Sequence, residues 1–197
     1  MAQREAETEQ VRSQYLYKQS VQLEEFDQRG RMAGSYKELR EVLFSPSGER
    51  SEQFAQKPEP HLKRLILTDE DFDDIRNIQP LLLTPDLLPR YQVKFRGEEV
   101  VDGVECWVLG VQPKQILRGM RMFEGDVWVD KKSLGVVRMS GQAVPPIYSQ
   151  GHENLFPRFT TIRKALDGLH YFPVLTYAHD TLPFRSGPLT IKLWIRY

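Results

Sequence analysis

The side chains best suited to bind a metal are four histidines in a chain of 197 residues. No two of them lie two or four residues apart, the spacings that place two ligands on one face of a strand or a helix. His170 and His179 fall on one expected strand at an odd spacing, so they point to opposite faces. We expect surface or loop histidines, with a site assembled in space, for example with Glu153, as the alternative. The four histidines are His61, His152, His170 and His179.

The single cysteine, Cys106, excludes a disulfide framework and any zinc or iron–sulfur site built from several cysteines. It lies in residues 104–112, where it points to one face of an expected strand and Trp107, Leu109 and Val111 point to the other. A strand that is apolar on both faces is covered on both faces. The sequence therefore predicts a buried, unreactive thiol.

Three aspartates, Asp69, Asp71 and Asp73, hold the first, third and fifth positions of a calcium-binding loop. The sixth position, which needs glycine, is Asp74, and the twelfth, which needs glutamate, is Pro80. We interpret these acids as the start of a helix, where the helix dipole favours negative charge. The sequence predicts no metal site and no cofactor.

Enzyme motifs are missing from the sequence, which has no nucleophile elbow, phosphate loop or dinucleotide fingerprint. Carboxylates are abundant, but no pair stands out for acid–base catalysis, although such pairs also assemble in three dimensions. The 27 basic and 27 acidic residues cancel, whereas a general nucleic-acid binder carries a basic excess. The sequence predicts neither an enzyme nor a nucleic-acid-binding protein.

Membrane and export signals are also missing from the sequence. No apolar stretch reaches the ~18–20 residues that span a bilayer. Residues 2–14 are polar where a signal peptide would be apolar. Two interpretations stay open: a cytoplasmic protein, or a mature form from which a signal peptide has been removed.

Alternation of apolar and polar residues predicts a β-protein with one domain over residues 15–197, preceded by a short helix or arm at 2–14. Loops are expected at 57–60 and 143–157, and a two-residue turn at Asp167-Gly168. The expected strands are residues 15–24, 35–45, 49–56, 91–96, 104–112, 123–130, 134–142, 158–166, 169–178 and 189–197.

A helical insertion is expected at about residues 68–89. Thr68 followed by Asp71 predicts a helix N-terminus, and Thr84-Pro85 predicts a second, very short helix. Apolar residues at helical spacing follow the first signal: Phe72, Ile75 and Ile78. The absence of strands alternating with helices argues against a parallel doubly wound sheet. We predict a mainly β fold, in which a single curved antiparallel sheet forms an unclosed β-barrel with short helices on its concave side.

Apolar residues exceed what one core face requires, because Trp128 and Trp194 lie opposite the clearer apolar stripe of their strands. One interpretation is a core on one face and scattered exposed tryptophans on the other. The second is a curved sheet around an apolar cavity, which could hold an acyl chain at ~0.8 kcal/mol per buried methylene without any polar motif. The residues expected to form the cavity and its lid are Phe72, Ile75, Leu81, Leu82, Leu83, Leu87, Leu88, Trp107 and Trp128.

Three segments resemble the outer-membrane lipoprotein-sorting proteins, the LolA-like family. They are residues 103–114 (GVECWVLGVQPK), 125–130 (GDVWVD) and 134–138 (LGVVR). The helical insertion and the Asp167-Gly168 hairpin leading to Phe172-Pro173 are also similar, so the resemblance covers most of residues 15–197. These motifs are short and mainly structural.

The resemblance implies an unclosed β-barrel with helices as a lid, in a protein that carries lipoproteins or other lipids across the periplasm. It implies that Met1 begins a mature form. It transfers no individual site residue, because the carrier's lid-locking arginine matches no position here. We therefore expect a periplasmic, non-enzymatic carrier or binder of an acylated lipid or lipoprotein. The alternative is a protein-interaction or envelope-sensor domain on the same scaffold, with an envelope protein as partner.

The leucine-rich part of the insertion is divided by Pro80, Pro85 and Pro89 into pieces too short to be stable helices alone. Pieces held mainly by tertiary contacts can open at modest cost. We expect a movable lid, and the alternative is that the leucines simply plug the sheet.

Overall fold

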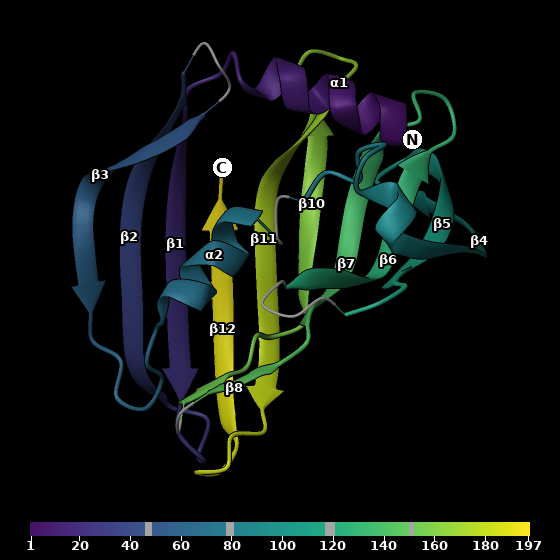
Figure 1. Ribbon diagram of the computed structural model, residues 1–197. Helices are drawn as coiled ribbons and strands as arrows, with labels where there is room; N and C mark the ends of the chain where they lie inside the picture. Colours follow the sequence, from purple (N-terminus) through teal and green to yellow (C-terminus); the bar gives the residue numbers. More distant parts are fainter. Residues whose placement is uncertain (46–48, 78–80, 117–120, 150–151) are drawn as a thin grey trace.

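The computed structural model describes residues 1–45, 49–77, 81–116, 121–149 and 152–197. Its main feature is one antiparallel sheet of ten strands in the order β3-β2-β1-β12-β11-β10-β7-β6-β5-β4 (Figure 1). The strands are β1 Tyr17–Phe26, β2 Met32–Phe44, β3 Arg50–Pro60, β4 Tyr91–Val101, β5 Val104–Pro113, β6 Met122–Asp130, β7 Val136–Val144, β10 Phe159–Ala165, β11 Tyr171–Leu182 and β12 Leu189–Arg196. A small separate hairpin pairs β8 Ile147–Ser149 with β9 His152–Asn154.

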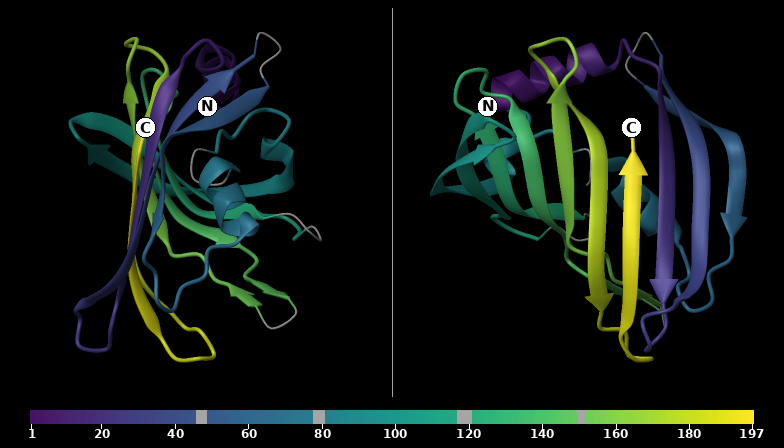
Figure 2. Two further views of the ribbon diagram at one scale, coloured as in Figure 1. Left: turned by 90° about the vertical axis from the view of Figure 1, so that its left-hand side faces the viewer. Right: turned by 180° about the vertical axis from the view of Figure 1, so that it is seen from behind.

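The sheet does not close, because its edge strands β3 and β4 each pair on one side only. Figure 2 shows that the sheet twists and bends around α2 (Asp69–Asn77), which lies on the concave side. The predicted fold class is confirmed. A second helix, α1 (Ala2–Arg12), crosses one end of the sheet (Figure 1).

The two faces of the sheet follow from period-two alternation. In β12, Leu189, Ile191, Leu193 and Ile195 are all buried, and the residues between them are half-buried. In β5, Trp107 packs against the main core on the concave side. Cys106 packs in a smaller cluster on the opposite, convex face, as do Trp128 of β6 and Val137 of β7. Both faces of this part of the sheet are therefore apolar, as the sequence predicted.

The start of α2 has the predicted cap. The backbone N–H and the hydroxyl of Thr68 both donate to the carboxylate of Asp71, at 2.8 and 3.1 Å. Both bonds run from Thr68 to Asp71, and the first satisfies a backbone N–H that the helix N-terminus leaves without a partner. Two residues named in the expected insertion, Ile78 and Pro80, lie outside the described residues.

Two expected loops contain strands. The loop expected at 57–60 belongs to β3, where a register shift lies opposite Lys37–Leu39. Prolines are tolerated on an edge strand and at such an irregularity, so Pro58 lies within the strand and Pro60 is its last residue. The stretch 143–157, expected to be irregular, contains the β8–β9 hairpin.

Two expected local structures also differ. The short helix expected after Thr84-Pro85 is a turn followed by a 3-10 helix, η1 (Leu88–Arg90), because so short a segment cannot nucleate an α-helix. The Asp167-Gly168 turn is wider than two residues. The carboxylate of Asp167 accepts the backbone N–H groups of Leu169 and His170, which draws them into a five-residue loop between β10 and β11.

Candidate functional site

The concave side of the sheet is filled by side chains of the insertion. Ile75 and Leu83 are buried in the main core, and Leu81 packs against it. The ring of Phe72 lies 6.2 Å from the ring of Tyr36 on β2, measured between centroids. Five of the nine residues predicted for the cavity and its lid thus share this core: Phe72, Ile75, Leu81, Leu83 and Trp107.

The other four predicted residues lie elsewhere. Leu82 is buried but belongs to no core cluster, and Leu87 and Leu88 are half-buried in the turn and at the start of η1. Trp128 lies on the convex face, where its indole N–H donates to Glu99 at 2.8 Å and the Arg138 guanidinium stacks 3.9 Å from its ring centroid. The structure therefore does not bring Trp128 together with the concave-side residues.

A buried ion pair joins α1 to the middle of the sheet. The guanidinium of Arg163 on β10 donates to the two carboxylate oxygens of Glu5 at 3.2 and 2.9 Å, and the two side chains are 0% and 1% exposed. Arg163 also donates to the backbone carbonyl of Leu81, and the N–H of Leu83 donates to Glu5 at 3.3 Å. One charged pair thus holds three segments that are remote in sequence.

This arrangement couples two movements. If α1 lifted, Arg163 would be left as a buried charge without its carboxylate, which costs several kcal/mol. If Leu81 and Leu83 moved instead, the pair would lose a carbonyl acceptor and an N–H donor. The Glu5–Arg163 pair therefore holds both α1 and the segment Leu81–Leu83 in place, and release of one segment weakens the contacts that hold the other.

An apolar groove of about 220 Å³ opens beside α1 at one end of the sheet. Its walls come from the α1–β1 connection, the loop between β10 and β11, and the adjoining ends of β1, β11 and β12. At its rim Leu16 and Leu166 are 59% and 64% exposed. The lining residues, here called the apolar groove, are Arg12, Tyr15, Leu16, Tyr17, Leu166, Phe172, Pro173, Val174 and Tyr197.

The polar groups of the apolar groove are few. Burial raises the pKa of Tyr197 and of Tyr17 above the usual range, so both phenols are neutral at physiological pH. Burial lowers the pKa of Arg12, and the nearby positive charges of Arg50 and Arg163 add to this effect. The Nε of Arg12 is buried and has no hydrogen-bond partner among the described residues. Arg12 also forms an ion pair with Glu9 at 3.9 Å and lies over the Phe44 ring. An apolar cleft lined by one cation is suited to an amphiphile with an acidic head.

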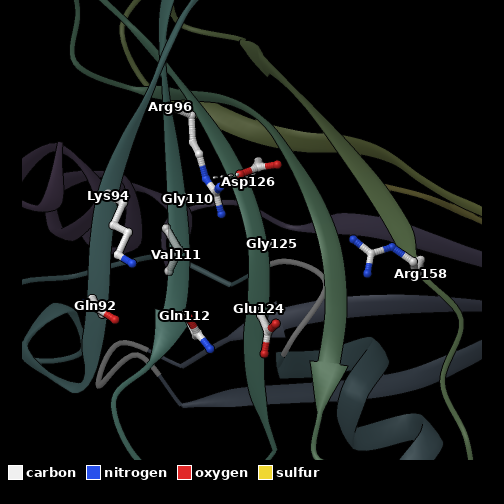
Figure 3. Close-up of a pocket in the computed structure, with 10 residues that line it drawn as sticks. All are labelled: Gln92, Lys94, Arg96, Gly110, Val111, Gln112, Glu124, Gly125, Asp126 and Arg158. Carbon is white, nitrogen blue, oxygen red and sulfur yellow. Dashed lines mark ion pairs between the residues drawn. The ribbon is translucent and has the colours of Figure 1, made fainter.

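A second hollow, also of about 220 Å³, lies on the convex face over β4, β5 and β6 (Figure 3). It is polar: Lys94, Arg96 and Arg158 point toward it together with Glu124 and Asp126. Arg96 lies above Gly110, where a Cβ would collide with its guanidinium, and its Nε is 3.6 Å from the Asp126 carboxylate. Exposed charges of both signs and a polar lining do not suit an acyl chain.

Metal-binding side chains are not grouped in the described residues. No cluster of three or more histidine, cysteine, aspartate or glutamate side chains there could hold a metal ion. Within the same residues, no helix is long and apolar enough to cross a membrane.

Cys106 is fully buried, and its thiol donates weakly to the carbonyl of Val104 at 3.4 Å. Burial raises its pKa, and the Asp130 carboxylate raises it further. Because the thiolate is the reactive form, we expect labelling of the folded protein by an aromatic disulfide reagent to be at least about 100-fold slower than labelling in denaturant. Absorbance of the released thiolate measures both rates. Comparable rates would contradict the burial of Cys106.

Comparison with known proteins gives similarity in structure only. No family model matches the sequence, and no curated protein matches it. The chain is similar to a DUF1329 family protein from Desulfovibrio piger, with 16% identity, a TM-score of 0.45, and coverage of 98% of this chain and 90% of that one. It is also similar to a putative outer membrane lipoprotein-sorting protein domain from Vibrio parahaemolyticus (12% identity, TM-score 0.44) and to a LolA superfamily protein from Nitrosomonas europaea (12%, 0.38). The last two comparisons each cover 98% of this chain and 90% of the other. These similar structures include the family that the sequence motifs resemble.

Sequence reasoning missed the Glu5–Arg163 pair and the apolar groove. Glu5 lies in a strongly polar helix, where nothing distinguishes it from the glutamates around it. Arg163 had one signal: it holds a core-facing position of β10 among buried residues, where a charge needs a partner. The groove combines three distant segments, so no local pattern indicates it.

Proposed function

We propose that the protein is a periplasmic, non-enzymatic binder or carrier of an acylated lipid or lipoprotein, and that the apolar groove receives the acyl chain. The observation that carries this proposal is an apolar groove with exposed rim residues, situated next to a buried ion pair that holds both α1 and the leucine segment. The resemblance of the sequence motifs to lipoprotein-sorting proteins supports the same class of ligand and the periplasmic location.

The size of the groove suggests how a chain enters. About 220 Å³ is below the 300–1,000 Å³ of ordinary ligand pockets, so the closed form accepts only part of a long chain. Each further methylene gains ~0.8 kcal/mol if apolar walls cover it. Movement of α1 and of Leu81–Leu83 would provide such walls, because these segments cover the concave core. Arg12 at the rim would then meet an acidic head group.

Binding of a fluorescent fatty acid tests the proposal. We expect saturable binding by the wild-type chain and a loss of affinity of at least about tenfold for Leu166→Asp, which places a charge at the rim. Leu166 is 64% exposed, so the fold should survive, as circular dichroism can check. Leu169→Asp is the matched control, since Leu169 is exposed on the same loop but does not line the groove.

A third variant distinguishes the two interpretations of the leucine segment, a movable lid or a fixed plug of the sheet. Leu87→Asp alters a half-buried residue of the leucine segment outside the groove, and it should change affinity only if this segment moves during binding. Absence of saturable binding by well-folded wild-type protein would defeat the carrier proposal. That result would favour the alternative, a protein-interaction or envelope-sensor domain with an envelope protein as partner.

A further inference from the structure

Strand β4 is an exposed edge of the sheet: in the described residues it pairs with β5 on one side and with no strand on the other. Nearly all its residues between Tyr91 and Val101 are exposed, including three large apolar ones, Val93 at 38%, Phe95 at 64% and Val100 at 64%. An exposed edge with free N–H and C=O groups is a template for a further strand. The opposite edge, β3, carries Pro58 and Pro60, which discourage such pairing.

The charges of β4 are divided along its length. Lys94 and Arg96 lie in the first half, whereas Glu98 and Glu99 lie in the second. When a strand of this kind pairs antiparallel with a second copy of itself, the basic half of each copy lies beside the acidic half of the other. Lys94 makes no ion pair with the described residues, so its ammonium group is available to pair with a carboxylate of a second copy.

A bulge in β4 fixes which residues share a face. Phe95 lies opposite Leu109 and Gly97 opposite Val108, so Arg96 is the additional residue. Before the bulge, Val93 and Phe95 face the concave side, since they pair with Val111 and Leu109 of β5. After it, the odd-numbered Glu99 faces the convex side, where it accepts the indole N–H of Trp128. Glu98 and Val100 therefore face the concave side.

One antiparallel register places opposite charges beside each other and keeps every pair of opposed residues on the same face of the sheet. A two-fold axis between Arg96 and Gly97 places Lys94 opposite Glu99 of the second copy on the convex face. The same axis places Val93 opposite Val100 of the second copy on the concave face. The bulge lies at the axis, so regular strand flanks it on both sides. No residue changes its face, and two apolar side chains become covered at each end.

We propose that two copies of this chain associate through antiparallel pairing of β4 with β4 in this register. Glu98 and Glu99 keep their own partners, Lys131 at 2.6 Å and Arg138 at 3.3 Å. They remain 56% and 49% exposed, and Glu99, which lies opposite Lys94 of the second copy, can receive this second cation. The interface is small, and the dimer forms at high protein concentration.

Cysteine pairing tests the register. Residues directly opposite in an antiparallel pair have Cα atoms about 4.5–5.5 Å apart, within the range of a disulfide. We expect the double variant Val93→Cys/Val100→Cys to form a disulfide-linked dimer under mild oxidation, seen on a non-reducing gel. Val93→Cys alone should stay monomeric, because the two copies of residue 93 lie about 23 Å apart along the sheet. Buried Cys106 does not compete.

Sedimentation equilibrium tests the association without cross-linking. Lys94→Glu should raise the dissociation constant of the dimer about fivefold or more, because it replaces two attractive contacts by two repulsive ones. Lys57→Glu, an exposed residue of the other edge strand, is the control and should leave the dimer unchanged. A wild-type chain that stays monomeric up to millimolar concentration would overturn the proposal. So would a disulfide-linked dimer that forms through Phe54→Cys on β3 as well as through the Val93→Cys/Val100→Cys pair.

Discussion

Replacement of Arg163 by methionine is expected to lower the free energy of unfolding by about 3–5 kcal/mol. The substitution leaves the carboxylate of Glu5 buried, with only the N–H of Leu83 as a described donor. The double variant Glu5→Gln/Arg163→Met should recover much of the loss, since replacing both members of a buried pair removes both desolvation costs. Urea denaturation followed by circular dichroism measures all three proteins.

Arg158→Met is the matched control for this prediction. Arg158 lies five residues earlier, directly before β10, but it is exposed, and among the described residues its guanidinium donates only to Gln142, at 3.4 Å. We expect its loss to change stability by less than about 0.5 kcal/mol. If Arg163→Met cost no more than Arg158→Met, the pair would not hold α1 to the sheet.

Stability is also expected to depend on the protonation of Asp74, which α2 buries against the sheet. Burial raises the pKa of Asp74 to about 7, and the negative charges of Asp71, Asp73 and Glu70 add to this effect. Arg121, whose guanidinium lies 3.4 Å from the Asp74 carboxylate, only partly opposes it. The folded state therefore binds a proton more tightly than the unfolded chain, in which the pKa is near 4.

This difference in pKa sets the direction in which stability changes with pH. The stabilising contribution of protonated Asp74 is fully present below about pH 4 and is lost as the pH rises toward about 7. The free energy of unfolding of the wild type should therefore fall by a few kcal/mol between pH 4.5 and 7.5 because of Asp74. Asp74→Asn should abolish this fall. Subtraction of the two curves cancels the other titrating groups. Such a decrease means that α2 is held more firmly in mildly acidic solution.

Asp73→Asn provides the control on the same helix, because the Asp73 side chain is 64% exposed. Its pH profile should keep most of the wild-type decrease, because burial raises the pKa of Asp74 more than the charge of Asp73 does. If Asp74→Asn kept the decrease as well, Asp74 would be solvated and α2 would not bury it.

The strands could be predicted because their information is local. Alternation alone located β12 and β5, and it assigned Cys106 and Trp107 to opposite faces. The pair of Glu5 and Arg163 could not be predicted, because 158 positions separate the two residues and the contact depends on how α1 crosses the sheet. Buried Asp74 was missed for a similar reason. The sequence shows it among acids at a helix start, and only tertiary packing distinguishes it from exposed Asp73.

The pairing of β1 with β12 brings together residues such as Ser20 and Arg196 in the middle of the sheet. Because β12 inserts between β1 and β11, it joins a three-strand meander on one side to six strands on the other. Before β12 pairs, these are two separate sheets with unpaired inner edges. The fold thus has a high contact order, which favours slow folding. Any form of the chain in which β12 has not yet paired leaves two strand edges exposed to pairing with other chains.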